Sequence, residues 1–115
     1  MIKKDIYNCG FELTLDLVGG KWKGLILWKL SEKEVLRYGE LSREIKGITQ
    51  KMLTQQLREM EEDNLIVRTV YHQIPPKVEY SLSEYGKQLS KIFIDMKNWG
   101  TQYAKENGIE VLCKL

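Results

Sequence analysis

The sequence has 115 residues, 43% of them hydrophobic and 30% charged, with a formal net charge of +2. This size and balance predict a single globular domain spanning residues 1–115 and exclude a disordered chain. No stretch reaches the about 20 apolar residues of a membrane span. The N-terminal MIKKDIYNC lacks the apolar core of a signal peptide, so we expect a cytoplasmic protein with no membrane partner.

Residues that carry chemistry are few. Two cysteines, Cys9 and Cys113, are too few for a disulfide framework and should be free thiols in a reducing compartment. The single histidine, His72, and the two cysteines do not have the spacing of zinc ligands, so the sequence predicts no zinc site. Phosphate-binding loops, nucleophile elbows and HExxH motifs are missing from the sequence. We therefore expect no metal, no cofactor and no enzymatic activity.

Helical patterns dominate the first third of the chain. Residues 11–18 predict a short helix that ends at Gly19-Gly20. Residues 21–30 are apolar nearly all round, which is typical of a central, buried helix. Within this helix, Gly24 predicts a close approach by another element. A charged turn at 31–34 and a short extended piece at 35–38 should follow.

Two closely joined helices come next. Residues 40–46 predict a short helix that ends at Gly47, and Thr49 is a good N-cap for a second helix over residues 50–63. Asn64 should close this second helix in the left-handed conformation. So tight a turn containing glycine indicates a helix-turn-helix.

The remaining segments complete a winged helix. Residues 65–73 and 77–82 are rich in β-branched and aromatic side chains and predict two strands of a hairpin, with Pro75-Pro76 in its loop. Ser83 should cap a long helix that runs to about residue 107. The order of elements predicts an α+β, mostly helical fold: a winged helix-turn-helix with a two-stranded wing and a long C-terminal helix.

A helical wheel divides the helix at 50–63 into two faces. Leu53, Leu57 and Met60 lie on one side, and polar or basic side chains that suit base edges and phosphates lie opposite. Basic residues outnumber acidic ones from residue 36 to residue 58, whereas residues 59–63 are mostly acidic, so the N-terminal half should enter the DNA groove. The predicted DNA contacts are Arg43, Thr49, Gln50, Lys51, Thr54, Gln55 and Arg58. The alternative is an ordinary solvated amphipathic helix.

The predicted hairpin also carries basic groups. His72 and Lys77 lie near its tip and Arg68 near its base. Wings of this kind contact the DNA backbone or minor groove, so His72 and Lys77 are further predicted phosphate contacts. The alternative is that they are isolated surface charges without a specific role.

Three segments of the sequence resemble a known family. GGKWKGLIL, LRYGELSREIKGITQKMLTQQLREMEEDNLIVRTVY and PPKVEYSLSEYG are similar to HxlR-type (DUF24) winged-helix regulators, distant relatives of MarR, over about residues 9–99. The resemblance implies a bacterial, cytoplasmic, homodimeric DNA-binding regulator. In some members a cysteine ahead of the first helix senses oxidants or electrophiles, and Cys9 stands at that position. The chain departs from the family pattern at Gly10, where proline is frequent, and at Asn64, where glycine is usual.

The resemblance and the long last helix together predict a dimer. A helix of about 25 residues is roughly 37 Å long, more than a small three-helix head covers. We expect the helices at 11–18 and 83–107 to pair between protomers and leave their apolar side chains exposed on a monomer. The predicted interface consists of Leu13, Leu17, Phe93, Met96, Trp99 and Tyr103. The alternative is that the last helix folds back over the central helix.

Cys9 is the predicted effector-responsive residue. At the start of a helix, backbone N–H groups favour a thiolate, and Lys3 and Lys4 are close in sequence. The alternative is a small packing residue. Cys113 is either a disulfide partner or a tail thiol.

These features are best explained if the protein is a sequence-specific transcriptional regulator that binds a palindromic operator as a homodimer. The alternative is a winged helix that serves only as a protein-interaction module, which would not need Lys51, Gln55 or Arg58 on its outer face. The effector and the target genes stay open.

Overall fold

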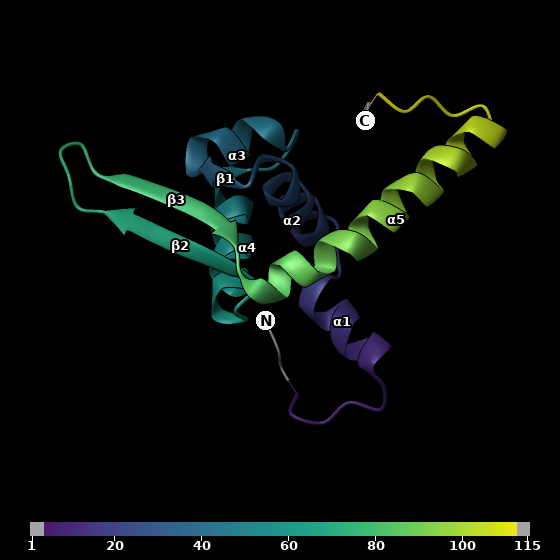
Figure 1. The fold of residues 1–115 in the computed structure, drawn as a ribbon, viewed down its shortest axis with the longest axis horizontal. Helices are drawn as coiled ribbons and strands as arrows, with labels where there is room; N and C mark the ends of the chain where they lie inside the picture. Colours follow the sequence, from purple (N-terminus) through teal and green to yellow (C-terminus); the bar gives the residue numbers. More distant parts are fainter. Residues whose placement is uncertain (1–3, 113–115) are drawn as a thin grey trace.

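The computed structural model describes residues 4–112 of the chain and places them in five helices and three strands (Figure 1). In chain order these are α1 (Gly10–Val18), α2 (Trp22–Lys33), β1 (Val35–Arg37), α3 (Tyr38–Glu44), α4 (Gln50–Glu62), β2 (Ile66–Tyr71), β3 (Lys77–Leu82) and α5 (Glu84–Glu106). The predicted winged helix-turn-helix is confirmed. Cys113 and Lys3, both named above, lie outside the described residues.

The wing is part of a small antiparallel sheet with the strand order β1-β3-β2. β2 pairs with β3 along their whole length, from Ile66 opposite Leu82 to Tyr71 opposite Lys77. The short β1 adds to the other edge of β3, with Leu36 opposite Tyr80. The sheet therefore joins the chain ahead of the helix-turn-helix to the hairpin that follows it. The hairpin tip projects from the head, the part of the protein formed by α2, α3, α4 and the sheet (Figure 1).

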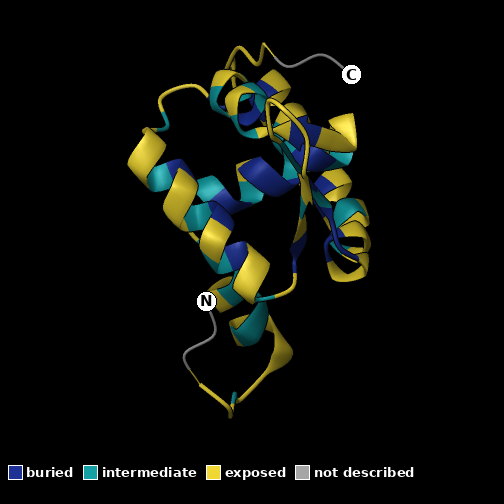
Figure 2. Ribbon diagram, turned by 90° about the vertical axis from the view of Figure 1, so that its left-hand side faces the viewer, coloured by how far each residue is buried: buried dark blue, intermediate teal, exposed yellow. Residues whose placement is uncertain are grey.

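The core lies where α2, α3, α4 and the sheet meet, and Figure 2 shows buried residues concentrated there. Leucine and isoleucine from each element fill it, together with Met60, Tyr80 and Phe93. Ile26, Leu27, Leu41 and Leu53 have no exposed surface. Burying such a side chain contributes roughly 1.5–3 kcal/mol, so this cluster fixes how α4 sits on the head.

Two predicted boundaries between helices were wrong. The charged turn expected at 31–34 is instead the last turn of α2, where Lys29 pairs with Glu32 at 3.4 Å. The helix ends only at Lys33, and its C-cap residue Glu34 adopts a positive φ of 69°. Helix α3 begins at Tyr38 rather than at residue 40 because the Glu40 side chain accepts a hydrogen bond from the Arg37 backbone N–H at 2.8 Å, which caps the helix earlier.

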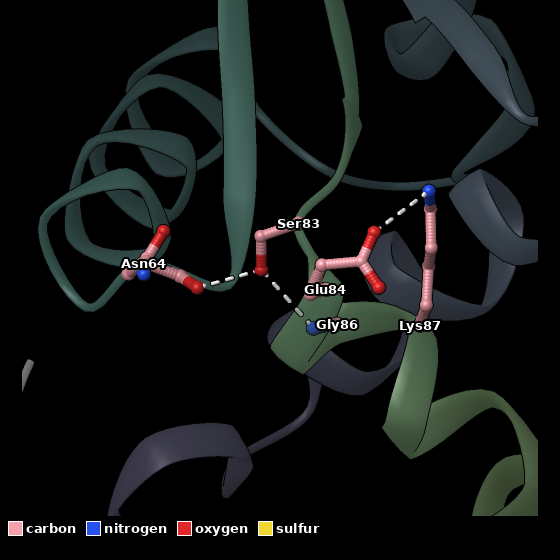
Figure 3. A network of polar contacts seen from close by, with 5 residues as sticks. All are labelled: Asn64, Ser83, Glu84, Gly86 and Lys87. Carbon is pink, nitrogen blue, oxygen red and sulfur yellow. Dashed lines mark hydrogen bonds and ion pairs between the residues drawn. The ribbon is translucent and has the colours of Figure 1, made fainter.

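The close approach expected at Gly24 occurs at Gly86 instead. An added Cβ at Gly24 would meet nothing within 4 Å, whereas one at Gly86 would collide with the backbone oxygen of Leu65. The Ser83 hydroxyl donates to the Asn64 carbonyl at 2.6 Å and accepts from the Gly86 N–H at 3.1 Å (Figure 3). The predicted roles of Ser83 as a helix cap and of Asn64, at φ 59°, are confirmed. This corner joins the end of α4 firmly to the start of α5.

Helices α1 and α5 extend beyond the head, on the side away from the wing tip (Figure 1). The expectation that Phe93 stays exposed on a monomer was wrong, because α5 crosses α2 at this point and Phe93 is only 8% exposed. Past that crossing Met96, Trp99 and Tyr103 are open to solvent, whereas Ala104 is buried. The protomer therefore leaves a hydrophobic surface on these two helices.

Candidate nucleic-acid interface

Helix α4 presents its two faces as the helical wheel predicts. Leu53, Leu57 and Met60 are buried against the head. Thr49 caps the helix, its hydroxyl accepting a hydrogen bond from the Met52 N–H at 3.1 Å. The preceding Gly47 has a φ of 86°, the left-handed geometry that favours glycine in so short a turn. Local sequence thus fixes both the start and the rotation of α4.

The outer face of α4 is exposed and gathers the predicted contacts. An open surface hollow of about 490 Å³ is lined by Tyr38, Gln50, Lys51, Thr54, Gln55 and Arg58. Thr49 lies exposed at the N-terminal end of this face. Lysine, arginine and glutamine on one exposed helical face match the donors and acceptors of a DNA major groove.

Tyr38 is part of this face, although the sequence analysis did not single it out. Its hydroxyl donates to the Gln50 carbonyl at 2.9 Å and lies 2.9 Å from the Thr54 hydroxyl oxygen. The first residue of α3 thereby braces the first turns of α4. A tyrosine at the start of the first helix of a helix-turn-helix was the available signal, but the sequence does not say where the ring points.

A second support that the sequence analysis missed runs from α2 to α4. Lys23 is only 7% exposed, and its Nζ lies 2.8 Å from Oε1 of Glu59. The Glu59 carboxylate in turn accepts a hydrogen bond from Nε2 of Gln55 at 3.2 Å. In the sequence Lys23 stands among the apolar residues of the first turns of α2, which was the available signal of a buried ion pair.

The two charges hold each other in the ionised state. Burial is the largest single effect and acts to lower the pKa of Lys23, but the hydrogen bond to Glu59 and the neighbouring charges together outweigh it, so the pKa is raised. The hydrogen bond from Lys23 lowers the pKa of Glu59, with help from the hydrogen bond of Gln55 and against the effect of burial. At neutral pH, Glu59 is therefore a carboxylate that only accepts hydrogen bonds.

The other predicted phosphate contacts are spread around α4. Arg43 is exposed in the last turn of α3. His72 is exposed in the wing loop, while Lys77 pairs with Glu79 at 3.2 Å and lies 4.8 Å from the centre of the Tyr71 ring. Arg68 lines a hollow between the wing and α4 that Arg58 also lines. Of the wing residues, His72 is more open to a partner than Lys77, whose charge is engaged within the wing.

Apart from the buried Phe93, the predicted dimer residues fall into two groups. Met96, Trp99 and Tyr103 are 62%, 70% and 50% exposed, and the last two rings stack with centroids 5.3 Å apart. Leu13 and Leu17 of α1 are half-buried within the protomer. The exposed apolar side chains of α1 are instead Phe11 and Leu15, which the sequence analysis did not select.

Cys9 lies immediately ahead of α1, in the N-cap position, and its side chain is exposed. Lys4, named above as a neighbour of the thiol, forms a 3.9 Å ion pair with Glu12 instead. The Tyr7 hydroxyl donates to Asp16 at 2.7 Å, and this bond raises the pKa of Tyr7 to about 12. Both contacts join a residue ahead of Cys9 to a residue of α1, so the segment that leads to the thiol lies along this helix.

The family model for the HxlR-like helix-turn-helix matches residues 17–108. The chain belongs to this family. It is 52% identical over 100 residues to the regulatory protein MalR of Fusobacterium mortiferum, covering 87% of this chain and 94% of that protein. Among solved structures, it is similar to the HTH-type transcriptional regulator ytcD, with 50% identity, a TM-score of 0.79, and coverage of 84% and 98% of the two chains.

A second similar solved structure is that of a redox regulator. The redox regulator HypR in its oxidized form superposes with a TM-score of 0.77 at 50% identity, covering 82% of this chain and 96% of that chain. The relatives are regulators, which favours the regulator interpretation over the interaction module. This HxlR-like chain is accordingly a winged helix-turn-helix transcriptional regulator. None of its described helices is both long and apolar enough to cross a bilayer.

Proposed function

We propose that the protein is a cytoplasmic, homodimeric regulator that binds a palindromic DNA operator through α4 and responds to oxidants or electrophiles at Cys9. The observation that carries the proposal is the outer face of α4, where Lys51, Gln55 and Arg58 are exposed side by side above a buried leucine face. Side chains of these types bind guanine, adenine and phosphate in the major groove. Thr49, Gln50, Thr54 and Arg43 at the N-terminal end of this surface, and His72 and Lys77 in the wing, would add backbone contacts.

The dimer follows from the two helices that extend beyond the head. With 23 residues, α5 is roughly 35 Å long. Its exposed Met96, Trp99 and Tyr103 lie on one side of the helix, together with Ile92 and Tyr85 nearer the head. Monomeric proteins seldom expose so continuous an apolar surface. A two-fold axis through this surface would set two α4 helices on half-sites one turn of DNA apart.

The responsive role of Cys9 is supported by its exposure and by the similarity to the redox regulator HypR. An exposed thiol is accessible to reagents, which disfavours the alternative of a small packing residue. Addition of the Cys9 sulfur to a quinone forms a carbon–sulfur bond, and the thiol proton passes to the ring, which becomes a substituted hydroquinone. Because α1 carries exposed Phe11 and Leu15 beside the proposed dimer surface, such a group would alter how two protomers meet.

The test is a gel-shift titration with a duplex from the DNA immediately upstream of the protein's own gene, compared with a scrambled duplex of the same length. A regulator of this type binds its specific site about 10³-fold or more tightly than unrelated DNA. Equal binding to both duplexes, across several upstream fragments, would contradict the proposed function.

A further inference from the structure

Three side chains form a row from the interior to the outer face of α4. Lys23 lies inside the head at 7% exposure, the Glu59 side chain is 23% exposed, and Gln55 lies on the exposed face. The contacts are 2.8 Å from Lys23 Nζ to Glu59 Oε1 and 3.2 Å from Gln55 Nε2 to Glu59 Oε2. Each oxygen of the Glu59 carboxylate thus has a donor of its own.

This arrangement decides which way the Gln55 amide faces. A glutamine amide has a donor end and an acceptor end, and on an open surface both orientations are accessible. A carboxylate has no proton to donate, so only the NH₂ end of Gln55 forms a bond with Glu59. Lys23 keeps Glu59 ionised and in place, since a lysine buried beside it stabilises the charged form. The Gln55 carbonyl oxygen is consequently turned toward the open surface.

We propose that Glu59 is a positioning residue for base recognition, which locks the Gln55 amide so that it presents its oxygen and its second N–H to DNA. This inference rests on the proposed function of α4. An acceptor beside a donor is the pattern that adenine complements in the major groove, through its N6 amino group and N7. The locked amide therefore specifies adenine at one position of each half-site, and Lys23 contributes to specificity through Glu59 without touching DNA.

The matched substitution is Glu59→Gln. It keeps the size of the side chain but lets the new amide pair with either end of Gln55, so that the orientation of Gln55 is no longer fixed. Removing one partner of a buried ion pair lowers stability, so a second variant, Lys23→Met with Glu59→Met, replaces the pair by apolar side chains of similar volume. Glu62→Gln, an equal change of charge at an exposed position of the same helix, is the control.

The experiment selects bound duplexes from a pool randomised over about 20 base pairs, enough for two half-sites one turn apart. Wild type and Glu62→Gln should enrich a symmetric site with one adenine per half-site that Gln55→Ala no longer selects. Glu59→Gln and the double methionine variant should lose discrimination about tenfold at that same base pair, the size expected of a bidentate contact, and keep the preferences elsewhere. The double variant Gln55→Ala with Glu59→Gln should show the same base preference at that position as Gln55→Ala alone.

Two results would overturn the inference. If Glu59→Gln and the double methionine variant enrich the wild-type site unchanged, Glu59 does not control Gln55. If they weaken all positions equally, in parallel with a lower melting temperature, the Lys23–Glu59 pair only stabilises the fold. Failure of the wild-type protein to enrich any sequence is a separate outcome, which would overturn the proposed function and this inference with it.

Discussion

The hydroxyl oxygen of Tyr38 lies 2.9 Å from Oγ1 of Thr54 and also 2.9 Å from the carbonyl oxygen of Gln50. A tyrosine hydroxyl has one proton, and the carbonyl, which has none, receives it. The Thr54 hydroxyl must therefore donate to Tyr38. Thr54 keeps its methyl group and an oxygen lone pair for a DNA partner but has no proton to offer to a phosphate.

Replacing Tyr38 by phenylalanine removes both bonds and leaves the ring. We expect the free energy of unfolding to fall by about 0.5–1.5 kcal/mol per bond, because each bond is replaced only in part by water. Urea denaturation measures the change, and operator binding should weaken as the first turn of α4 loosens. Lys91→Gln, at an exposed position of α5 outside its apolar stripe, is the control and should leave both quantities unchanged.

Alanine at Lys51, Gln55 and Arg58 should separate two kinds of DNA contact. Loss of a base-reading side chain costs about 1–3 kcal/mol on the specific site, whereas loss of a phosphate contact weakens binding to all sequences and reduces the salt slope by about 1. Fluorescence anisotropy at a series of salt concentrations gives both quantities. Lys91→Ala, on the far side of α5 from its apolar stripe, should bind as wild type does. A folded triple variant with normal operator affinity would show that α4 does not read DNA.

A charge within the apolar stripe of α5 should separate the protomers. Trp99→Glu places a carboxylate where a 70% exposed indole now lies, and burying it in an interface without a partner is unfavourable. Sedimentation velocity at micromolar concentration should give a dimeric mass for wild type and a monomeric mass for this variant. Asn98→Glu adds the same charge on another side of the helix and should stay dimeric. A monomeric wild type would refute the proposed dimer.

Cys9→Ser tests the responsive thiol without disturbing the start of α1, because serine is itself a favourable N-cap residue. The variant should bind the operator as wild type does. Treatment with diamide or a quinone should change binding by wild type and by Cys113→Ser but not by Cys9→Ser. If wild type and Cys9→Ser respond alike, the signal enters elsewhere.

The Lys23–Glu59 pair predicts a specific loss of stability in acid. Since the pKa of Glu59 is lower in the folded chain than its ordinary value of 4.5, the unfolded chain takes up this proton first as the pH falls. The contribution of Glu59 to the free energy of unfolding is present above pH 4.5 and disappears as the pH passes through the lower, folded pKa. Urea denaturation between about pH 6 and pH 3 should show this component in wild type and Glu62→Gln, and its absence from Glu59→Gln.

Sequence patterns predicted the order of elements, both faces of α4, the caps at Thr49 and Ser83 and the wing. These features depend on local rules: periodicity, a hydroxyl ahead of a helix, and prolines confined to a loop. The wrong predictions depend on tertiary contacts. The turn expected at 31–34 was replaced by helix, where Ser31 hydrogen-bonds Ser90 of α5 at 3.0 Å, a partner 59 positions away.

The same limit applies to the DNA-facing surface. The wheel identified which side chains of α4 face outward, but the groups that orient them come from other helices: Tyr38 from α3 and Lys23 from α2. Phe93 has the same periodicity as its exposed neighbours, and only the crossing of α2 and α5 explains its burial. Periodicity gives the direction of a side chain, and the packing of other elements decides what it meets.

The corner at Asn64, Ser83 and Gly86 determines where the chain can be cut to exchange its DNA-binding part with that of a relative. The N–H and hydroxyl of Ser83 bond the carbonyls of Leu65 and Asn64, and Gly86 leaves no room for a side chain against Leu65. Suppose that the DNA-binding part of the chain is exchanged between two relatives at a cut just after the wing. The first turn of α5 then comes from the other protein and has to fit this corner. The segment to be transplanted should therefore run past Gly86 into α5. DNA recognition and the angle at which the long helix leaves the head are then transferred together.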